Sequence, residues 1–240
     1  MESIPKKYMD HITKLEERIG YTYKDKSHAL NALIHSSYAN ELNGAFSFKN
    51  NERLEFLGDA ILDFAMGMML YNNNPDMSEG EMSKTRALIV CEASLAACAQ
   101  ELGIGELVFL GKGEENSGGR NRPSILSDCL EAIIGSLYLD GGMDEAEGFI
   151  VGLLGETYQK AVHGKLFMDY KTTLQEELQK TGDVKIQYKL MEAIGPDHAK
   201  SFKMLVSVNG KTLGVGCGKS KKEAEQDAAK AALEALKGNQ

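Results

Sequence analysis

Two patterns of hydrophobic and polar residues follow one another along the chain. From Met1 to about Tyr158, apolar residues recur at spacings of three and four, which predicts helices, and the alternation typical of strands is scarce. The sequence "NNNPD" at 72–76 and the glycine pair at 141–142 interrupt this pattern, so we expect helices to end there. Residues 1–158 are therefore predicted to form an all-α domain.

The pattern changes after a short segment, residues 159–168, which we interpret as a linker. Beyond it, a helix in residues 169–182 precedes three stretches that alternate in polarity and carry β-forming residues, and an alanine-rich helix follows. The three predicted strands are residues 186–194, 200–209 and 211–219. Residues 169–240 are therefore predicted to form a small α+β domain with the order α-β-β-β-α.

Local signals predict several helix starts and one long connection. Three pairs have the spacing of N-terminal capping boxes or their Asp equivalents: Ser78 with Glu81, Asp144 with Glu147, and Ser220 with Glu223. Residues 111–123 are rich in glycine but lack the spacing of a phosphate-binding loop, so we interpret them as a connection within reach of substrate.

Charge divides the chain at nearly the same place as the hydrophobic pattern. The whole protein has a net charge of −8, which by itself argues against a nucleic-acid partner. Residues 165–240, however, hold 13 Lys against 10 acidic residues, a net charge of +3. Residues 1–164 hold 14 Lys and Arg against 25 acidic residues, a net charge of −11. The two parts are therefore expected to have different tasks, and the basic part suits a polyanion.

Three carboxylates interrupt the otherwise apolar stretch "NNERLEFLGDAIL" at residues 50–62. Glu52, Glu55 and Asp59 lie three and four positions apart, which places them on one face of a helix. The residues around them are almost all apolar, which is typical of a buried helix. Partly desolvated carboxylates are costly unless they are paired or bind a metal.

A second predicted helix, residues 124–140, repeats this arrangement. It carries Asp128 and Glu131, three positions apart, in another apolar run, and a further acid, Glu79, begins the predicted helix "SEGEMSKTRALIV". Carboxylate oxygens gathered from two buried helices suit Mg²⁺ or Mn²⁺, with water completing an octahedral coordination shell. The sequence therefore predicts a divalent-metal site made from these acids, and it leaves open whether one or two ions bind.

Two alternatives stay open for these acids, and two other chemistries are disfavoured. The acids could form a solvated face, or Arg86, Arg120 or Arg122 could neutralise them in a structural ion-pair network. A di-iron bundle is disfavoured because the chain has no Glu-x-x-His pair. A metal-free ribonuclease is disfavoured because the histidines are scattered, and His35 is expected to be a hydrogen-bonded structural residue.

The basic part contains features that suit duplex RNA. Lys221 and Lys222 lie at the expected start of the last helix, where free N–H groups and the positive dipole end attract phosphate. Gln175 and Gln179 share one face of the preceding helix, from which amides can reach the 2′-hydroxyls and base edges of the wide RNA minor groove. His198 lies in a turn between the first two predicted strands. Together these residues predict an RNA-binding surface.

In these same stretches the sequence resembles the ribonuclease III family. "NERLEFLGDAIL" resembles the family's signature motif, and "ALIHSSYANE", "SEGEMSKTRA" and "SILSDCLEAIIGSLYLD" resemble other blocks of its nuclease domain. "TTLQEELQ", "GPDHAKSF" and "GKSKKEAEQDAA" resemble a double-stranded RNA-binding domain. The blocks follow the order of the bacterial enzymes that have one nuclease domain.

This resemblance implies a fold and an activity. It implies an all-α nuclease domain followed by a double-stranded RNA-binding domain, in an endonuclease that cuts double-stranded RNA with Mg²⁺, or with Mn²⁺ in its place, and without an organic cofactor. It further implies a homodimer through the nuclease domain and products with 5′-phosphate and 3′-hydroxyl ends and short 3′ overhangs. Ribosomal RNA precursors are the expected substrates, with some messenger, transfer and small RNAs.

The resemblance also implies roles for single residues. Glu55, Asp128 and Glu131 match the metal-binding acids of the family. Asp59 and Glu131 match its catalytic acids, and Glu52 and Glu79 match accessory acids of the cleft. The positions that match RNA-contacting residues are Gln175, Gln179, His198, Lys221 and Lys222.

Two rival functions are weaker. Intact acids at every matched position argue against a non-catalytic protein that binds double-stranded RNA. An all-α magnesium enzyme acting on a diphosphate would have Asp-rich clusters, which are absent, and would leave residues 165–240 unexplained. No apolar run approaches the roughly 18–20 residues that span a bilayer, and the N-terminus lacks the apolar region of a secretory signal. We therefore expect a cytoplasmic protein without membrane contact.

Overall fold

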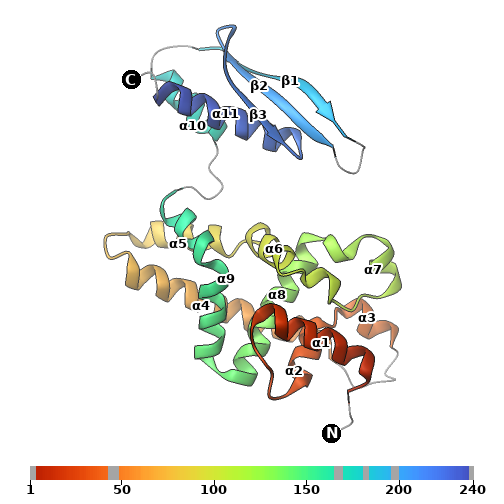
Figure 1. Cartoon of the computed structure of the whole chain (residues 1–240). Helices are drawn as coiled ribbons and strands as arrows, with labels where there is room; N and C mark the ends of the chain where they lie inside the picture. The colour runs from red at the N-terminus through yellow and green to blue at the C-terminus, as the bar shows by residue number, and fades with distance from the viewer. Residues whose placement is uncertain (1–3, 43–48, 165–169, 181–183, 196–199, 238–240) are drawn as a thin grey trace. The chain divides into compact units, whose positions relative to one another are not determined.

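The computed structural model describes residues 4–42, 49–164, 170–180, 184–195 and 200–237. The chain forms two compact units, Met1–Leu166 and Phe167–Gln240 (Figure 1). The boundary between them falls inside the segment that we expected to be a linker. Each unit is described by itself below.

The described part of the N-terminal unit is helical, as the sequence predicted, apart from an isolated β-bridge between Ile34 and Phe109. Its first helices are α1 (Lys6–Ile19), α2 (Lys26–Leu33), α3 (Ser36–Glu41), α4 (Glu52–Asn73) and α5 (Glu79–Ile89). They are followed by α6 (Glu92–Glu101), α7 (Lys112–Asn116), α8 (Pro123–Gly141) and α9 (Met143–Val162), with 3₁₀ turns at Ile104–Glu106 and Gly119–Asn121.

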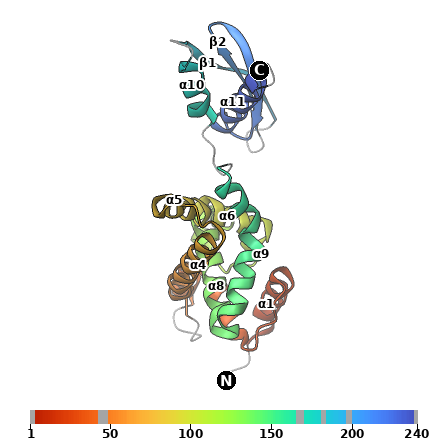
Figure 2. The same cartoon turned by 90° about the vertical axis from the view of Figure 1, so that its left-hand side faces the viewer.

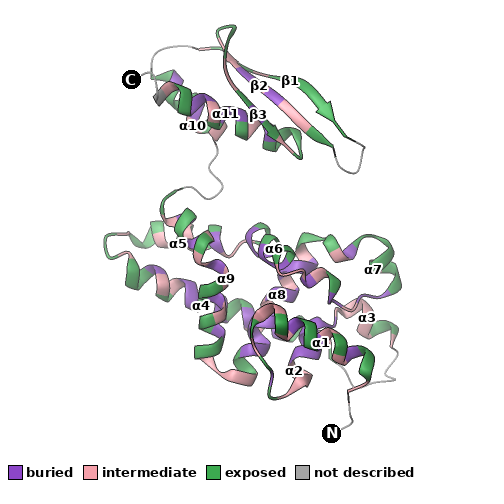
Figure 3. Ribbon diagram, in the orientation of Figure 1, coloured by how far each residue is buried: buried purple, intermediate pink, exposed green. Residues whose placement is uncertain are grey.

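Helix α8 is the central helix of this unit, and it packs against α2, α4, α6 and α9 (Figure 2). Figure 3 shows that much of α8 is buried. Its sequence is apolar on nearly every side, which is typical of a helix that other helices cover. The side chains that it buries include Ile125, Leu126, Leu130, Ile133, Ile134 and Leu137. The core of the unit is therefore organised around α8.

Helix α9 corrects the expected start of the linker. It continues to Val162, so the first four residues of the segment 159–168 are helical. Tyr158 is 3% exposed and Ala161 is 7% exposed, because both side chains pack into the core. The helix therefore extends for as long as it has an apolar face to bury.

Two other local expectations for this unit were wrong. Residues 111–123 are not one irregular connection, because they include α7 and a 3₁₀ turn, and the Arg120 guanidinium holds them against the carbonyls of Gly105 and Val108 at 2.9 and 3.1 Å. Asp144 does not cap α9, whose N-cap position is occupied by Gly142. The capping box of Ser78 and Glu81 at the start of α5 is confirmed.

The C-terminal unit has the predicted order α-β-β-β-α. Its elements are α10 (Tyr170–Gln179), β1 (Ile186–Ile194), β2 (Ser201–Val208), β3 (Lys211–Gly218) and α11 (Lys221–Lys237). The strands form an antiparallel sheet in the order β1-β2-β3. Asn209 and Gly210 connect β2 to β3 with φ angles of 50° and 81°, and these positive values suit a two-residue hairpin turn.

Close contact between α11 and the sheet depends on small residues. A Cβ atom on Gly214 would lie 2.4 Å from the carbonyl oxygen of Ala228, and one on Gly216 would lie 2.1 Å from the amide nitrogen of the same residue. Leu174 and Leu178 of α10 pack into the same small core. The glycines of β3 and the alanines of α11 thus set the distance between helix and sheet.

Candidate functional site

An acidic cluster lies where α4 and α8 cross. It consists of Glu55 on α4 and of Asp128 and Glu131 on α8, and one carboxylate oxygen from each lies within 4.8 Å of the others. All three residues are half-buried. The structure thus brings together the three acids that were predicted to bind metal, from two helices far apart in the sequence.

Two glycines allow the helices to approach closely enough for this. A Cβ atom on Gly58 of α4 would lie 1.8 Å from the carbonyl oxygen of Glu131, and one on Gly135 of α8 would lie 2.4 Å from the carbonyl oxygen of Leu54. Any larger residue at either position would push the two backbones apart and separate the carboxylates.

Gly58 and Gly135 were not among the functional residues predicted from the sequence. A signal for them was present, because glycine inside a helix costs about 1 kcal/mol relative to alanine and so needs a packing or functional reason. Both glycines lie in the apolar helices that carry the acids, and Gly58 directly precedes Asp59. Glycine inside an apolar helix that also carries the acids is the pattern that would have found them.

The cluster holds its negative charge at an energetic cost. Burial is the main cause that raises the pKa of Glu131 to about 8, and the charges of Asp59 and Asp128 add to it. Burial also raises the pKa of Glu55 and of Asp128. A hydrogen bond of 3.3 Å from the Ser127 hydroxyl lowers the pKa of Asp128 in part. These carboxylates therefore favour protonation or a bound cation.

The arginines that could have neutralised the cluster pair with other acids. Arg86 lies 3.6 Å from Asp63, Arg120 pairs with Glu115 at 2.5 Å, and Arg122 pairs with Glu114. Across the described ranges, no ion pair involves Glu55, Asp59, Asp128 or Glu131. The donor set is thus three carboxylates that no lysine or arginine of the described residues pairs with, which fits a divalent ion with hard oxygen ligands.

Asp59 and Glu52 flank the cluster on α4, one turn on either side of Glu55, and both are exposed. The negative charge of Asp59 raises the pKa of Glu131, so its carboxylate lies close to the cluster without being one of its three members. The charge of Glu52 raises the pKa of Glu55 in the same way. The negative charge of Asp63, a residue that was not predicted as part of the site, also raises the pKa of Glu131.

Glu79 does not join the cluster, contrary to its expected place in the same cleft. It begins α5, accepts a hydrogen bond from the Ser83 hydroxyl at 2.9 Å, and lines a hollow with Gly67 and Tyr71. Gly67 is twelve residues beyond Glu55 on α4, which is about 18 Å along a helix. Within a single chain, Glu79 therefore lies at the opposite end of α4.

His35 is a hydrogen-bonded residue, as expected. Its Nδ1 atom lies 2.8 Å from the Ser37 hydroxyl and 3.2 Å from the Ser37 backbone nitrogen, which places it as the N-cap of α3. The imidazole therefore closes a helix end.

The predicted RNA-contacting residues lie on the helices of the C-terminal unit. Gln175 and Gln179 are exposed on α10, and Lys221 and Lys222 are exposed in the first turn of α11. The Ser220 hydroxyl accepts a hydrogen bond from the backbone N–H of Glu223 at 3.1 Å, which fixes the start of α11. His198 lies outside the described residues.

Comparison with known proteins identifies both units. A family model described as ribonuclease-III-like matches residues 25–157, and a model of the double-stranded RNA binding motif matches residues 170–236. The chain belongs to the ribonuclease III family. Its C-terminal unit is a double-stranded RNA-binding domain, and the protein is an endoribonuclease of this family.

Relatives cover almost the whole chain. Ribonuclease 3 of Pelotomaculum thermopropionicum is 48% identical over 226 residues, which cover 93% of this chain and 92% of that protein. Ribonuclease 3 of Bacillus cereus is 47% identical over 233 residues, which cover 96% and 94% respectively. These lengths show that the ribonuclease III relatives share both domains.

A solved structure supports the fold of the N-terminal unit. The nuclease domain of the Campylobacter jejuni ribonuclease III matches 60% of this chain and 96% of its own with a TM-score of 0.56 and 42% identity. That structure is described as containing a region involved in dimer formation. In the described part of our chain, no helix is both long enough and apolar enough to cross a membrane.

Proposed function

We propose that this ribonuclease III cleaves double-stranded RNA at the acidic cluster, where Glu55, Asp128 and Glu131 hold Mg²⁺, or Mn²⁺ in its place. The observation that carries this proposal is the convergence of three half-buried carboxylates, with one oxygen from each within 4.8 Å of the others, and no lysine or arginine of the described residues pairs with them. A divalent ion bound there supplies positive charge beside the reacting phosphate and lowers the pKa of a coordinated water.

The residues around the cluster account for the rest of the reaction. Asp59, exposed beside Glu131, orients the attacking water and accepts its proton on a carboxylate oxygen. The water oxygen bonds to phosphorus while the bond from phosphorus to the 3′-oxygen breaks. The 3′-oxygen takes up a proton, so the products carry 5′-phosphate and 3′-hydroxyl ends.

A cleavage assay tests this proposal. A labelled RNA duplex is incubated with the full-length protein in Mg²⁺, in Mn²⁺, in Ca²⁺ and in EDTA, and the product ends are analysed. We expect cleavage in Mg²⁺ and Mn²⁺, loss of cleavage in EDTA, and fragments with 5′-phosphates. Binding without cleavage in Mg²⁺ at several pH values would support the non-catalytic RNA-binding alternative instead.

A homodimer through the nuclease domain is part of the proposal. Exposed apolar residues follow one side of α4, and Phe56, Phe64 and Tyr71 are 79%, 59% and 70% exposed. A row of this kind marks an interaction site, and the dimer-forming relative from Campylobacter jejuni makes a second copy of this chain the expected partner. In this proposal Glu79 serves as an accessory acid of the partner's cleft.

Sedimentation equilibrium tests the dimer. Phe64→Glu places a charge in the exposed row and should halve the mass in solution, whereas Val151→Glu, at a site on α9 that is 40% exposed, should leave the mass unchanged. An unchanged mass for Phe64→Glu would place the interface elsewhere. The natural substrates that we propose are precursors of ribosomal RNA and some messenger, transfer and small RNAs in the cytoplasm.

A further inference from the structure

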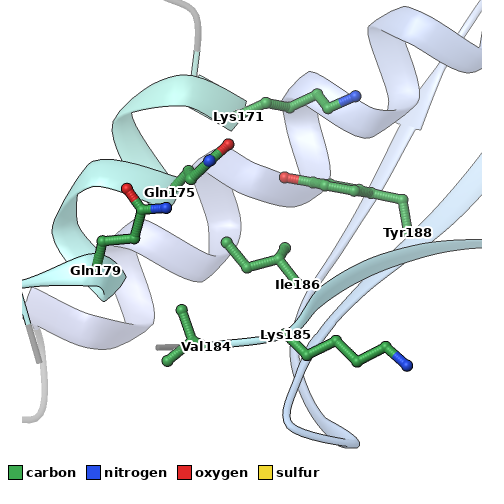
Figure 4. A pocket seen from close by; sticks show the side chains of 7 residues that line it. All are labelled: Lys171, Gln175, Gln179, Val184, Lys185, Ile186 and Tyr188. Atoms are coloured by element: carbon green, nitrogen blue, oxygen red, sulfur yellow. The ribbon is translucent and has the colours of Figure 1, made fainter. Parts of the chain in front are cut away.

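Lys171 lies in the first turn of α10, on the same face as Gln175 and Gln179, because the three positions are four residues apart. A groove of ≈ 430 Å³ runs along this face (Figure 4). Its walls are Lys171, Gln175, Gln179, Val184, Lys185, Ile186 and Tyr188. The two glutamines expected to contact RNA therefore share a surface with a lysine whose role has not been assigned.

The side chain of Lys171 is held by two other elements. Its Nζ atom lies 2.6 Å from a carboxylate oxygen of Glu225 on α11 and 4.7 Å from the centre of the Tyr188 ring on β1. The backbone N–H of Lys171 also donates to the side-chain oxygen of Gln226 at 3.3 Å. Lys171 thus connects α10 to both β1 and α11, and Figure 4 shows the lysine beside the tyrosine ring.

This environment differs from that of a lysine placed to bind phosphate. Glu225 already balances the charge of Lys171, and an approaching phosphate would be repelled by that carboxylate. Lys221 and Lys222, by contrast, are exposed at the start of α11 and take part in no ion pair found in the described residues. The ammonium group of Lys171 is therefore used within the domain, whereas those of Lys221 and Lys222 are available to a ligand.

Helix α10 needs such a connection. It has 10 residues, fewer than the roughly 12–15 that make an isolated helix even marginally stable in water. Its buried residues are Leu174 and Leu178, which form a single stripe four residues apart. Tyr170 packs against the same core, and Lys171 attaches α10 to β1 and α11 at a position beside this stripe.

We propose that Lys171 is a positioning residue for RNA binding, which sets the rotation of α10 and thereby the direction of the Gln175 and Gln179 amides. The inference rests on the proposed contact of these glutamines with RNA. It assigns Lys171, Glu225 and Tyr188 a task in RNA recognition without any contact to the RNA itself.

The dependence of binding on salt separates this role from a phosphate contact. The affinity of the full-length protein for an RNA duplex is measured without divalent metal over a series of salt concentrations. Lys171→Met should weaken binding about fivefold to tenfold, as expected for loss of a partly buried ion pair and cation–π contact. The slope of log K against log salt should stay unchanged. A slope reduced by about 0.9, the change per lost phosphate contact on duplex DNA, or an unchanged affinity, would overturn the proposal.

Glu225→Gln gives the second test. If Lys171 positions α10, removing its carboxylate partner should weaken RNA binding as Lys171→Met does. The single variant Lys171→Arg, which keeps the positive charge, should retain most of the affinity that Lys171→Met loses. If Lys171 contacts phosphate, removing the repelling carboxylate should tighten binding, which would contradict the proposal. Glu225→Gln leaves every buried side chain in place, so it remains informative even if Lys171→Met unfolds the domain.

Two controls complete the design. Lys222→Met should reduce the salt slope by about 0.9, which shows that the assay detects a lost phosphate contact. The double variant Gln175→Ala and Gln179→Ala should weaken binding. If that double variant binds normally, the RNA contact of the glutamines is wrong. If it binds weakly while Lys171→Met binds normally, the positioning role is wrong and the RNA contact stands.

Discussion

The acidic cluster of the N-terminal unit takes Glu55 from α4 and takes Asp128 and Glu131 from α8, and all three side chains are half-buried. The residues proposed to contact RNA, Gln175 and Gln179 on α10 and Lys221 and Lys222 on α11, are exposed instead, and each pair is placed by a single helix. A site shared by two packed helices depends on every group that sets their separation. A surface built from separate exposed side chains loses binding in small steps. Substitutions in the two units should therefore differ in size and in kind.

The largest expected effect is loss of the reaction when Glu131 loses its charge. Glu131→Gln should reduce cleavage of a labelled duplex by about a thousandfold, or ~4 kcal/mol in transition-state stabilisation, while duplex affinity remains. Glu147→Gln, at an exposed position on α9, should cleave normally. If Glu131→Gln loses affinity and cleavage together, the residue supports the structure and not the reaction.

The next effect tests the crossing of the two helices. Gly58→Ala places a methyl group against the carbonyl oxygen of Glu131 and should lower the free energy of unfolding by about 1–3 kcal/mol while also reducing cleavage. Gly152→Ala is the matched control, because outside the backbone of α9 itself no atom of the described residues lies within 4 Å of its Cβ position. That control should raise the free energy of unfolding by about 0.5–1 kcal/mol. Thermal or urea unfolding measures the free energy of unfolding of both variants. A Gly58→Ala variant as stable as the unsubstituted protein would show that the crossing tolerates a side chain.

The RNA surface should respond more gradually. Replacing Lys221 and Lys222 together by Met should lower duplex affinity about tenfold at physiological salt and reduce the salt slope by about 1.8, for two lost phosphate contacts. The cleavage rate at saturating RNA should stay the same. Lys211→Met, at an exposed position on β3, is the control. A changed rate at saturation would mean that α11 also affects the active centre.

The smallest effect is a dependence of metal binding on pH. Glu131 has a folded pKa of about 8 and an ordinary value of 4.5, so the folded protein without metal holds a proton there that the unfolded chain releases. This group's contribution to stability therefore falls as pH rises from 4.5 to 8. A metal displaces the proton, so the rise in Tm on adding Mn²⁺ should grow between pH 6 and pH 8 and level off above 8.

Differential scanning fluorimetry of the full-length protein measures this rise in Tm. Glu131→Gln should abolish most of its change with pH, because glutamine has no proton to displace. An equal rise in Tm at pH 6 and pH 8 in the unsubstituted protein would show that the metal does not compete with protons at this cluster.

Local sequence patterns predicted much of the fold and of the site. They failed for features that depend on contacts between residues far apart in the sequence. Helical spacing, strand alternation and the Ser78 capping box predicted elements that the structure contains, because each depends on neighbours in the sequence. The end of α9 at Val162 could not be found this way, since it depends on the burial of Tyr158 and Ala161. Glu79 matched a family position, but spacing along the chain does not show at which end of α4 it lies.

The sequence by itself determined that the chain has a helical acidic part and a basic α-β-β-β-α part, because periodicity and charge are properties of the residue order. It also pointed to the three acids at the centre of the site. Only the tertiary structure decided that these acids meet, because their separation is set by the backbone contacts of Gly58 and Gly135 across the crossing of α4 and α8. Likewise, the ion pair of Lys171 with Glu225 joins residues that no local sequence pattern relates. It depends on the packing of α10 against α11.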